Sequence, residues 1–446
     1  MPVLPSSLIA LLSLLRPAFT APTFQTFEAL LAGMIARVGE RTVCGMWQAA
    51  RLAGRVHHSV AHDFFARSRW SADEVGLRLL DFLIERFVAA DRAIVLAVDG
   101  SVFSRSGPKV HGAVWHHDSS AAQGGGFRYG NCFVVVGLVV RIGVLGQRAW
   151  CLPVLFRLWL PTPKPSDACP VPKRRPSQQN LAAVLVALVA ERHPGRQIDV
   201  VGDSAFACKA MGALPVAVTL TSRLRSNAVI CAPKPGPTGK RGRPRVTGRR
   251  LGNPAQIAAA SKPSDWQTFD VPGRGQATAL VIEGLWYSVF AARSVRVVIV
   301  REPADTDGYQ IALISTDPDA STSTIVARYA DRWSIEVAFQ DAKHVTGVGE
   351  ARNRVKLAVE RTVPFGLLCQ SIAIAWYALH GDAAADIRRR RLEAPWYPQK
   401  RDPSMLDILA ALRRELIRTK YQAQAGRTPI PAQTNRPAPP RTAAAA

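Results

Sequence analysis

The sequence predicts an α/β fold, with a helical region at each end and a β-rich insertion in the sheet-forming part. Apolar residues recur at three- and four-residue spacing through the first 90 residues. From residue 93 onward, short continuous apolar runs alternate with helical segments, and strand-like segments follow one another between residues 279 and 317. Strands that alternate with helices are typical of an α/β sheet.

The N-terminal region, residues 1–90, is expected to be a helical DNA-binding domain. Ser71 and Glu74 have the residue types and the spacing of a capping box ahead of a predicted helix at residues 75–90. The basic stretch at residues 41–70 could hold a helix-turn-helix. A helical bundle with no role in DNA binding would show the same pattern.

Residues 91–228 are expected to form the first part of the core sheet. A continuous apolar run at residues 93–98 ends at Asp99, as in a strand buried on both faces. A second short strand, from residue 198, ends at Asp203. The other predicted elements are strands at residues 131–144, 148–160 and 215–224, and helices at residues 178–192 and 208–211.

A basic loop opens the predicted β-rich insertion, residues 229–318. Residues 233–250 contain seven basic residues, four Gly, four Pro and no acidic residue, so we expect no packed element there. We expect the strand-like segments that follow to form an antiparallel insertion. These segments are residues 279–292, 294–302 and 309–317.

The last part of the chain is expected to be mostly helical. One long helix is predicted from near Ser321 to beyond Lys343, within a second part of the core at residues 319–380. Residues 381–446 are expected to be a helical C-terminal region with a Pro- and Ala-rich disordered tail from Ala425.

The charge of the chain predicts a polyanionic partner. The 57 Lys and Arg residues outnumber the 33 Asp and Glu residues and give a net charge of +24. Nucleic acid and an anionic membrane surface are the usual partners of such a chain. The most apolar stretch, residues 364–380, is shorter than the ~20 residues that a membrane span needs. Seven single cysteines suit a reducing compartment, so we expect a cytoplasmic protein that binds DNA or RNA, not a membrane.

Two aspartates, Asp99 and Asp203, follow apolar strands. Ligands of α/β sheets gather beyond the carboxyl ends of the strands, so the two carboxylates can converge on one metal site. The alternative is that both are turn or cap residues, a role for which Asp is favoured on local grounds alone.

A stripe of polar residues on the predicted long helix favours the metal site. The stripe consists of Tyr329, Arg332, Glu336 and Lys343. At about 100° per residue all four lie within about 40° of Glu336 around the helix axis. Trp333 and Phe339 flank the stripe, so it need not face bulk water, and we expect Trp333 to pack beside it. A solvated face held by weak ion pairs is the alternative, and it gives no reason for the aromatic flanks.

These residue types fit phosphoryl-transfer chemistry. The candidate catalytic and metal-binding residues are Asp99, Asp203 and Glu336. Three carboxylates can hold two hard cations, which activate the attacking oxygen and stabilise the leaving oxygen of an in-line displacement. Arg332 and Lys343 could clamp the flanking phosphates, and Tyr329 could donate to a phosphate or orient the scissile strand.

The spacing Y-(2)-R-(3)-E-(6)-K resembles the signature of bacterial insertion-sequence DDE transposases, which have a ribonuclease H-like catalytic core. VDGSVFSRSGPK resembles the first-Asp region of that family, and GDSAF the second. The resemblance covers about residues 90–380 and implies a ribonuclease H-like mixed sheet. It also implies that Asp99, Asp203 and Glu336 are the metal-binding triad, and that Tyr329, Arg332 and Lys343 contact the transposon ends.

The expected function is therefore that of a Mg²⁺-dependent DNA transposase, with Mn²⁺ able to substitute for Mg²⁺ and with a site for two ions. It would bind double-stranded DNA at the transposon ends and in the target, as a homodimer on DNA. The open alternatives are a ribonuclease H-like nuclease or resolvase without strand transfer, and a non-enzymatic DNA-binding protein.

The basic loop offers a second candidate DNA contact. Its Arg-Gly-Arg-Pro core is that of an AT-hook, which lies in a narrow A·T-rich minor groove. A generic basic loop that follows phosphates is the alternative. The candidate residues are Lys240, Arg241, Arg243 and Arg245. Two histidine groups, at residues 57–62 and 116–117, are expected to be surface or loop residues, not metal ligands.

Overall fold

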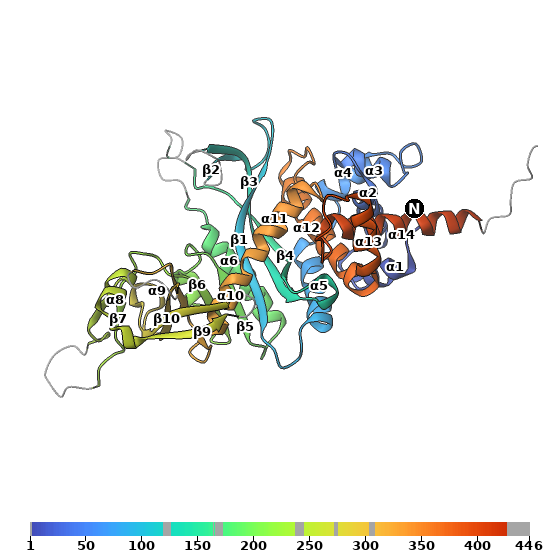
Figure 1. Ribbon diagram of the computed structural model, residues 1–446. Coiled ribbons are helices and arrows are strands. Elements are labelled where there is room, and N and C mark those ends of the chain that lie inside the picture. The colour runs from blue at the N-terminus through green and yellow to red at the C-terminus, as the bar shows by residue number, and fades with distance from the viewer. Residues whose placement is uncertain are drawn as a thin grey trace, which may run out of the picture.

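One mixed sheet of ten strands organises the molecule, which is described here from a computed structural model (Figure 1). The structure describes residues 2–118, 126–163, 165, 173–236, 245–271, 275–302 and 308–425. The strands of the sheet are β1 (Ile94–Ser104), β2 (Val114–Asp118), β3 (Gly126–Arg141), β4 (Ala149–Trp159), β5 (Ile198–Gly202), β6 (Val218–Arg223), β9 (Trp266–Val271), β10 (Gly275–Gly284), β11 (Val295–Arg301) and β12 (Ile311–Ser315).

The strand order confirms the predicted α/β class. Strands β2-β3-β1-β5-β6-β12-β11-β10-β9 follow one another across the sheet, and β4 pairs with β3. β1, β5 and β6 are parallel neighbours, whereas the other pairs are antiparallel. β5, predicted as a short apolar strand that ends at Asp203, is buried along its whole length. With helices at both ends of the chain, this arrangement is consistent with a ribonuclease H-like core.

Strand β1 is longer than predicted. The sequence placed its end before Asp99, but β1 continues to Ser104. The parallel pairing with β5 does end there, at Val98 opposite Gly202. Antiparallel pairing with β3 holds the rest of β1 in extended form, from Asp99 opposite Val135 onward. Asp99 therefore lies where the parallel pairing stops and not where the strand stops.

The predicted β insertion is antiparallel, and it extends the main sheet. β12 pairs with β6, and β11, β10 and β9 follow outward (Figure 1). One segment was predicted wrongly: the end of the run at residues 279–292 contains a short helix, α9 (Tyr287–Phe290), because Phe290 turns into the apolar core. A small second sheet pairs β7 (Ile230–Cys231) with β8 (Arg250–Gly252), beside α8 (Pro254–Ala260).

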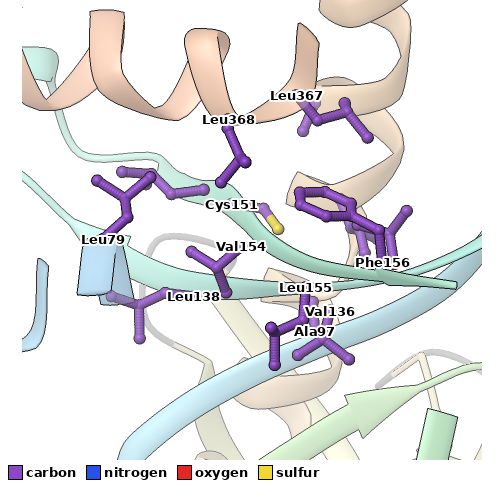
Figure 2. Packing of buried hydrophobic residues seen from close by; sticks show 14 of the residues in the cluster. Leu79, Ala97, Val136, Leu138, Cys151, Val154, Leu155, Phe156, Leu367 and Leu368 are labelled. Atoms are coloured by element: carbon purple, nitrogen blue, oxygen red, sulfur yellow. The ribbon is translucent and has the colours of Figure 1, made fainter. Parts of the chain in front are cut away.

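The N-terminal helices pack on the core. They are α1 (Ser6–Ser13), α2 (Ala21–Ala36), α3 (Val43–Ala49), α4 (Ser59–Ala66) and α5 (Ala72–Phe87). The Ser71 hydroxyl accepts a hydrogen bond from the Glu74 backbone N–H, so this half of the predicted capping box is confirmed. Leu79 of α5 belongs to a buried hydrophobic cluster that also contains residues of β4 and of the helix α12 (Lys356–His380), as Figure 2 shows.

Helix α12 is the central helix of the core. The apolar stretch at residues 364–380 was expected to be too short for a membrane span, but the helix has 25 residues and is long and apolar enough to cross a membrane; 89% of its most apolar stretch is buried inside the protein. Leu367 and Leu368 of α12 face Val154 and Phe156 of β4 (Figure 2). Burial of this kind accounts for the apolar composition without a lipid environment.

Two further helices close the C-terminal part. They are α13 (Ala383–Glu393) and α14 (Met405–Ala425), and α14 packs on α12 and α2. The predicted tail after Ala425 lies outside the described residues. The predicted helix at residues 178–192 is α6 (Gln178–Arg192), and the short one near residue 208 is α7 (Lys209–Gly212).

The predicted long helix after Ser321 is divided into α10 (Thr322–Asp331) and α11 (Trp333–His344). Arg332 joins them with helical dihedral angles, φ −50° and ψ −37°. The N–H of Ile335, three residues on, donates a 3₁₀-type hydrogen bond to the Arg332 carbonyl. The two helices therefore follow each other with little change of backbone conformation.

Candidate active site

Two aspartates lie at the same edge of the parallel strands. Asp99 follows the last β1–β5 pair, and Asp203 directly follows β5. One oxygen of each carboxylate is used locally: the Gly100 N–H donates to Asp99 Oδ1 at 2.7 Å, and the Ala205 N–H donates to Asp203 Oδ1 at 2.9 Å. The turn role considered from the sequence is thus present in part. It still leaves the second oxygen of each carboxylate for other partners.

Helices α10 and α11 bring the third carboxylate to this edge. Arg332 Nη2 lies 2.7 Å from Glu336 Oε1, and Arg332 Nη1 lies 3.7 Å from Asp99 Oδ2. The guanidinium is also 5.6 Å from the centre of the Tyr329 ring. Arg332 therefore connects the sheet to the helices and lies between two of the three carboxylates.

A pocket of about 750 Å³ contains all six residues that the sequence singled out on the sheet and the helices. They are Asp99, Asp203, Tyr329, Arg332, Glu336 and Lys343. The helical spacing predicted that the last four share one face, and the fold turns that face toward the two aspartates. Elements more than 100 residues apart in sequence thus form one acidic pocket with a basic margin.

Burial and neighbouring charge alter the acidity of Asp99. The pKa of its carboxyl is raised to about 6, mainly by burial and in smaller part by the carboxylates of Asp203 and Glu336. The Gly100 N–H and the Arg332 guanidinium act in the opposite direction. A buried acid that titrates near neutrality inside a cleft is typical of a functional site.

The carboxylates of the pocket are ligands of the type that hard divalent cations prefer, but their side chains are not positioned in this structure to hold an ion. Carboxylate oxygens are the ligands that Mg²⁺ and Mn²⁺ prefer. Among the described residues, however, no group of three or more His, Cys, Asp or Glu side chains is placed to hold a metal ion. Arg332 lies between Asp99 and Glu336 instead, so these side chains would have to rearrange to bind an ion.

Several residues of the pocket were missed or misplaced by the sequence reasoning. His116 and His117 lie in strand β2 and line the pocket, although a polar loop was expected there. Arg128 of β3 and Arg223 at the end of β6 line it as well. A signal existed for Arg223, because β6 follows β5 in the parallel part and its end reaches the same edge.

Trp333 differs from its prediction. We expected it to pack beside the polar stripe, but 59% of its surface is exposed. Phe339, on the other flank, is buried. Helix α11 packs against β4 and α12 with the side that carries Phe339. The side that carries the Trp333 indole is not covered and remains at the pocket margin.

Of the four candidate DNA-contacting residues of the basic loop, one lies among the described residues. Lys240, Arg241 and Arg243 lie outside the described residues. Arg245 is described, is exposed, and does not line the pocket.

The family described as "DDE superfamily endonuclease" matches residues 14–279, more than half of the chain. The matched range contains Asp99 and Asp203, and it ends before Glu336 and the other residues of the helical stripe. No curated protein matches the chain.

Proposed function

Because the chain belongs to the DDE superfamily endonucleases, we propose that it is an insertion-sequence transposase that cleaves DNA at the element ends and joins the freed 3′-hydroxyl to target DNA. The observation that carries this proposal is the single pocket in which Asp99, Asp203 and Glu336 meet a basic margin. The family match supports an endonuclease, and strand transfer is the further step proposed here.

We assign the roles by chemistry. Asp99, Asp203 and Glu336 would hold Mg²⁺, or Mn²⁺ in its place, and two such ions supply activation of the attacking oxygen and stabilisation of the leaving oxygen when bound. Lys343 and Arg332 would hold phosphates on either side of the scissile bond. Tyr329 would donate to a phosphate oxygen or orient the scissile strand.

The same pocket would serve both displacements. In the first, a water oxygen attacks the scissile phosphorus and the 3′-oxygen leaves as a hydroxyl. In the second, that hydroxyl attacks a phosphorus of target DNA, the bond from this phosphorus to the target strand's own 3′-oxygen breaks, and that oxygen leaves as a hydroxyl. Residues 1–90 and the basic loop would recognise the terminal repeats, and a homodimer would pair two ends in the bacterial cytoplasm. A complex of one chain with one end would contradict the proposed pairing.

Glu336→Gln tests the enzymatic proposal. With a labelled duplex that carries the element's own end and Mg²⁺, we expect the variant to cleave on the order of 10³-fold more slowly than the unaltered chain. The reason is that metal catalysis supplies several kcal/mol and each 1.36 kcal/mol is tenfold in rate. DNA binding, measured by fluorescence anisotropy, should persist.

Glu283→Gln is the matched control. Glu283 is an exposed carboxylate that pairs with Arg296 outside the pocket, so its loss should not affect cleavage. Equal cleavage by the Glu336 and Glu283 variants would contradict the proposed site. Cleavage without any joined product on added target DNA would instead indicate a nuclease or resolvase.

A further inference from the structure

We propose that Arg332 is an internal counter-ion that competes with divalent metal for Asp99 and Glu336 and is drawn away by the phosphates of bound DNA. Metal binding and DNA binding would then strengthen each other. This inference rests on the proposed function of the pocket and adds a mode of regulation to it.

The contacts of Arg332 place its charge where a metal ion would have to enter. Its side chain is only 11% exposed, and its two terminal nitrogens face Glu336 and Asp99 at 2.7 and 3.7 Å. A guanidinium stays protonated in proteins, so a fixed positive charge lies between two candidate metal ligands.

This position is incompatible with a shared metal ion. Hard cations need direct carboxylate contacts at about 2.0–2.6 Å. A carboxylate oxygen already bonded to a guanidinium has to exchange that partner before it can bind an ion. Two positive charges would otherwise lie within a few ångströms of each other inside a partly buried pocket, where their repulsion is strong.

The structure also offers Arg332 an alternative place. A second hollow of about 700 Å³ lies between α10 and strands β10–β12, next to the acidic pocket. Arg332, Tyr329, Trp333 and Arg223 line both hollows. The Arg332 Nε atom is buried and has no hydrogen-bond partner among the described residues, so rotation of the side chain breaks no bond at that atom.

A DNA phosphate would favour that rotation. A guanidinium binds a phosphate through two parallel hydrogen bonds, which are charge-assisted and stronger than neutral ones. Once Arg332 has turned to the phosphate, Asp99 and Glu336 have lost their counter-ion and attract a cation more strongly. Because binding couplings are reciprocal, the metal would raise DNA affinity by the same factor, typically about 5- to 150-fold.

Titration of the full chain with Mn²⁺, with free Mn²⁺ measured by electron paramagnetic resonance, tests the inference. The titration is made without DNA and with a duplex already cut at the element end, so that no cleavage accompanies binding. For the unaltered chain we expect the duplex to raise Mn²⁺ affinity about 5- to 150-fold. Arg332→Met should bind Mn²⁺ more tightly than the unaltered chain without DNA, and should gain little when DNA is added.

Arg223→Met is the matched control, since Arg223 carries the same charge in both hollows. Arg223→Met should keep the effect of DNA on Mn²⁺ affinity, because general loss of positive charge is not the proposed cause. If Arg332→Met does not fold by circular dichroism, Arg332→Lys replaces it. A lysine has a single ammonium and cannot bridge both carboxylates as the fork does, so Mn²⁺ affinity without DNA should still rise.

The outcomes separate this inference from the proposed function. Mn²⁺ binding that Glu336→Gln weakens but that the Arg332 variants leave unchanged would overturn the inference alone. Mn²⁺ binding that is indifferent to Glu336, or no binding with or without DNA, would overturn the proposed site and the inference with it.

Discussion

Asp99→Asn is expected to abolish metal-dependent cleavage and, at neutral pH without metal, to raise the free energy of unfolding by about 2–3 kcal/mol. The carboxyl has a pKa of about 6 in the folded chain against an ordinary value of 3.8. Each pKa unit corresponds to 1.36 kcal/mol, so holding the charged form in this pocket costs about that amount. The amide of Asn has nearly the same shape and carries no charge.

The direction of the change in the free energy of unfolding follows from how this free energy depends on pH. Between about pH 4 and pH 6 the folded chain keeps a proton on Asp99 that the unfolded chain releases. Without metal, the free energy of unfolding therefore falls as the pH rises through this window. The gain from Asp99→Asn should be near zero at about pH 4 and complete above about pH 6, as measured by urea unfolding in the presence of a chelator.

Asp91→Asn is the control for the Asp99 experiment. Asp91 is exposed just before the same strand, and its replacement should change the free energy of unfolding by less than about 0.5 kcal/mol. An Asp99→Asn chain that is no more stable than the unaltered one at pH 7, or that still cleaves, would contradict the account of the pocket.

Arg328→Met is expected to lower the free energy of unfolding by about 3–5 kcal/mol. Arg328 of α10 binds two carboxylates at once: Nη2 is 2.5 Å from Asp199 Oδ2, and Nη1 is 2.8 Å from Asp317 Oδ2. Asp199 is only 2% exposed, so removal of the guanidinium leaves a buried carboxylate that keeps its hydrogen bond from the Thr219 hydroxyl but has lost its counter-ion. Since α10 also carries Tyr329, cleavage should fall together with stability.

Two comparisons sharpen the Arg328 experiment. Arg141→Met removes a more exposed ion pair with Asp331, the last residue of α10, and should lower the free energy of unfolding by no more than about 1 kcal/mol. Adding Asp199→Asn to Arg328→Met should restore part of the loss, because it removes the uncompensated charge. If chemical denaturation gave Arg328→Met and Arg141→Met equal losses, the buried ion pair would not have the importance assigned to it.

Local patterns were sufficient for much of the fold and for part of the site. The helix at residues 178–192 was predicted with the bounds that α6 has, because its apolar pattern is local to the segment, and in the structure Ser177 caps its first turn. The common face of Arg332, Glu336 and Lys343 followed from helical spacing in the same way, even though the helix is interrupted at Arg332.

What required the tertiary structure was every feature made by pairing between distant segments. The extension of β1 past Asp99 depends on β3, and the joining of the insertion to the main sheet depends on the β12–β6 pair. Neither pairing could be predicted from the sequence, because many apolar segments can form the same backbone hydrogen bonds with a neighbouring strand. The exposure of Trp333 likewise depended on which side of α11 the core covers.

The sequence by itself thus determined the α/β class, the main helices and the residue types that phosphoryl transfer needs, since each of these is encoded over a few turns of chain. Only the tertiary structure decided that Arg332 lies between Asp99 and Glu336, and that β2 brings His116 and His117 to the same pocket. Ion pairs of this kind depend on distances between elements, and the burial that makes them strong exists only after the sheet and helices have packed.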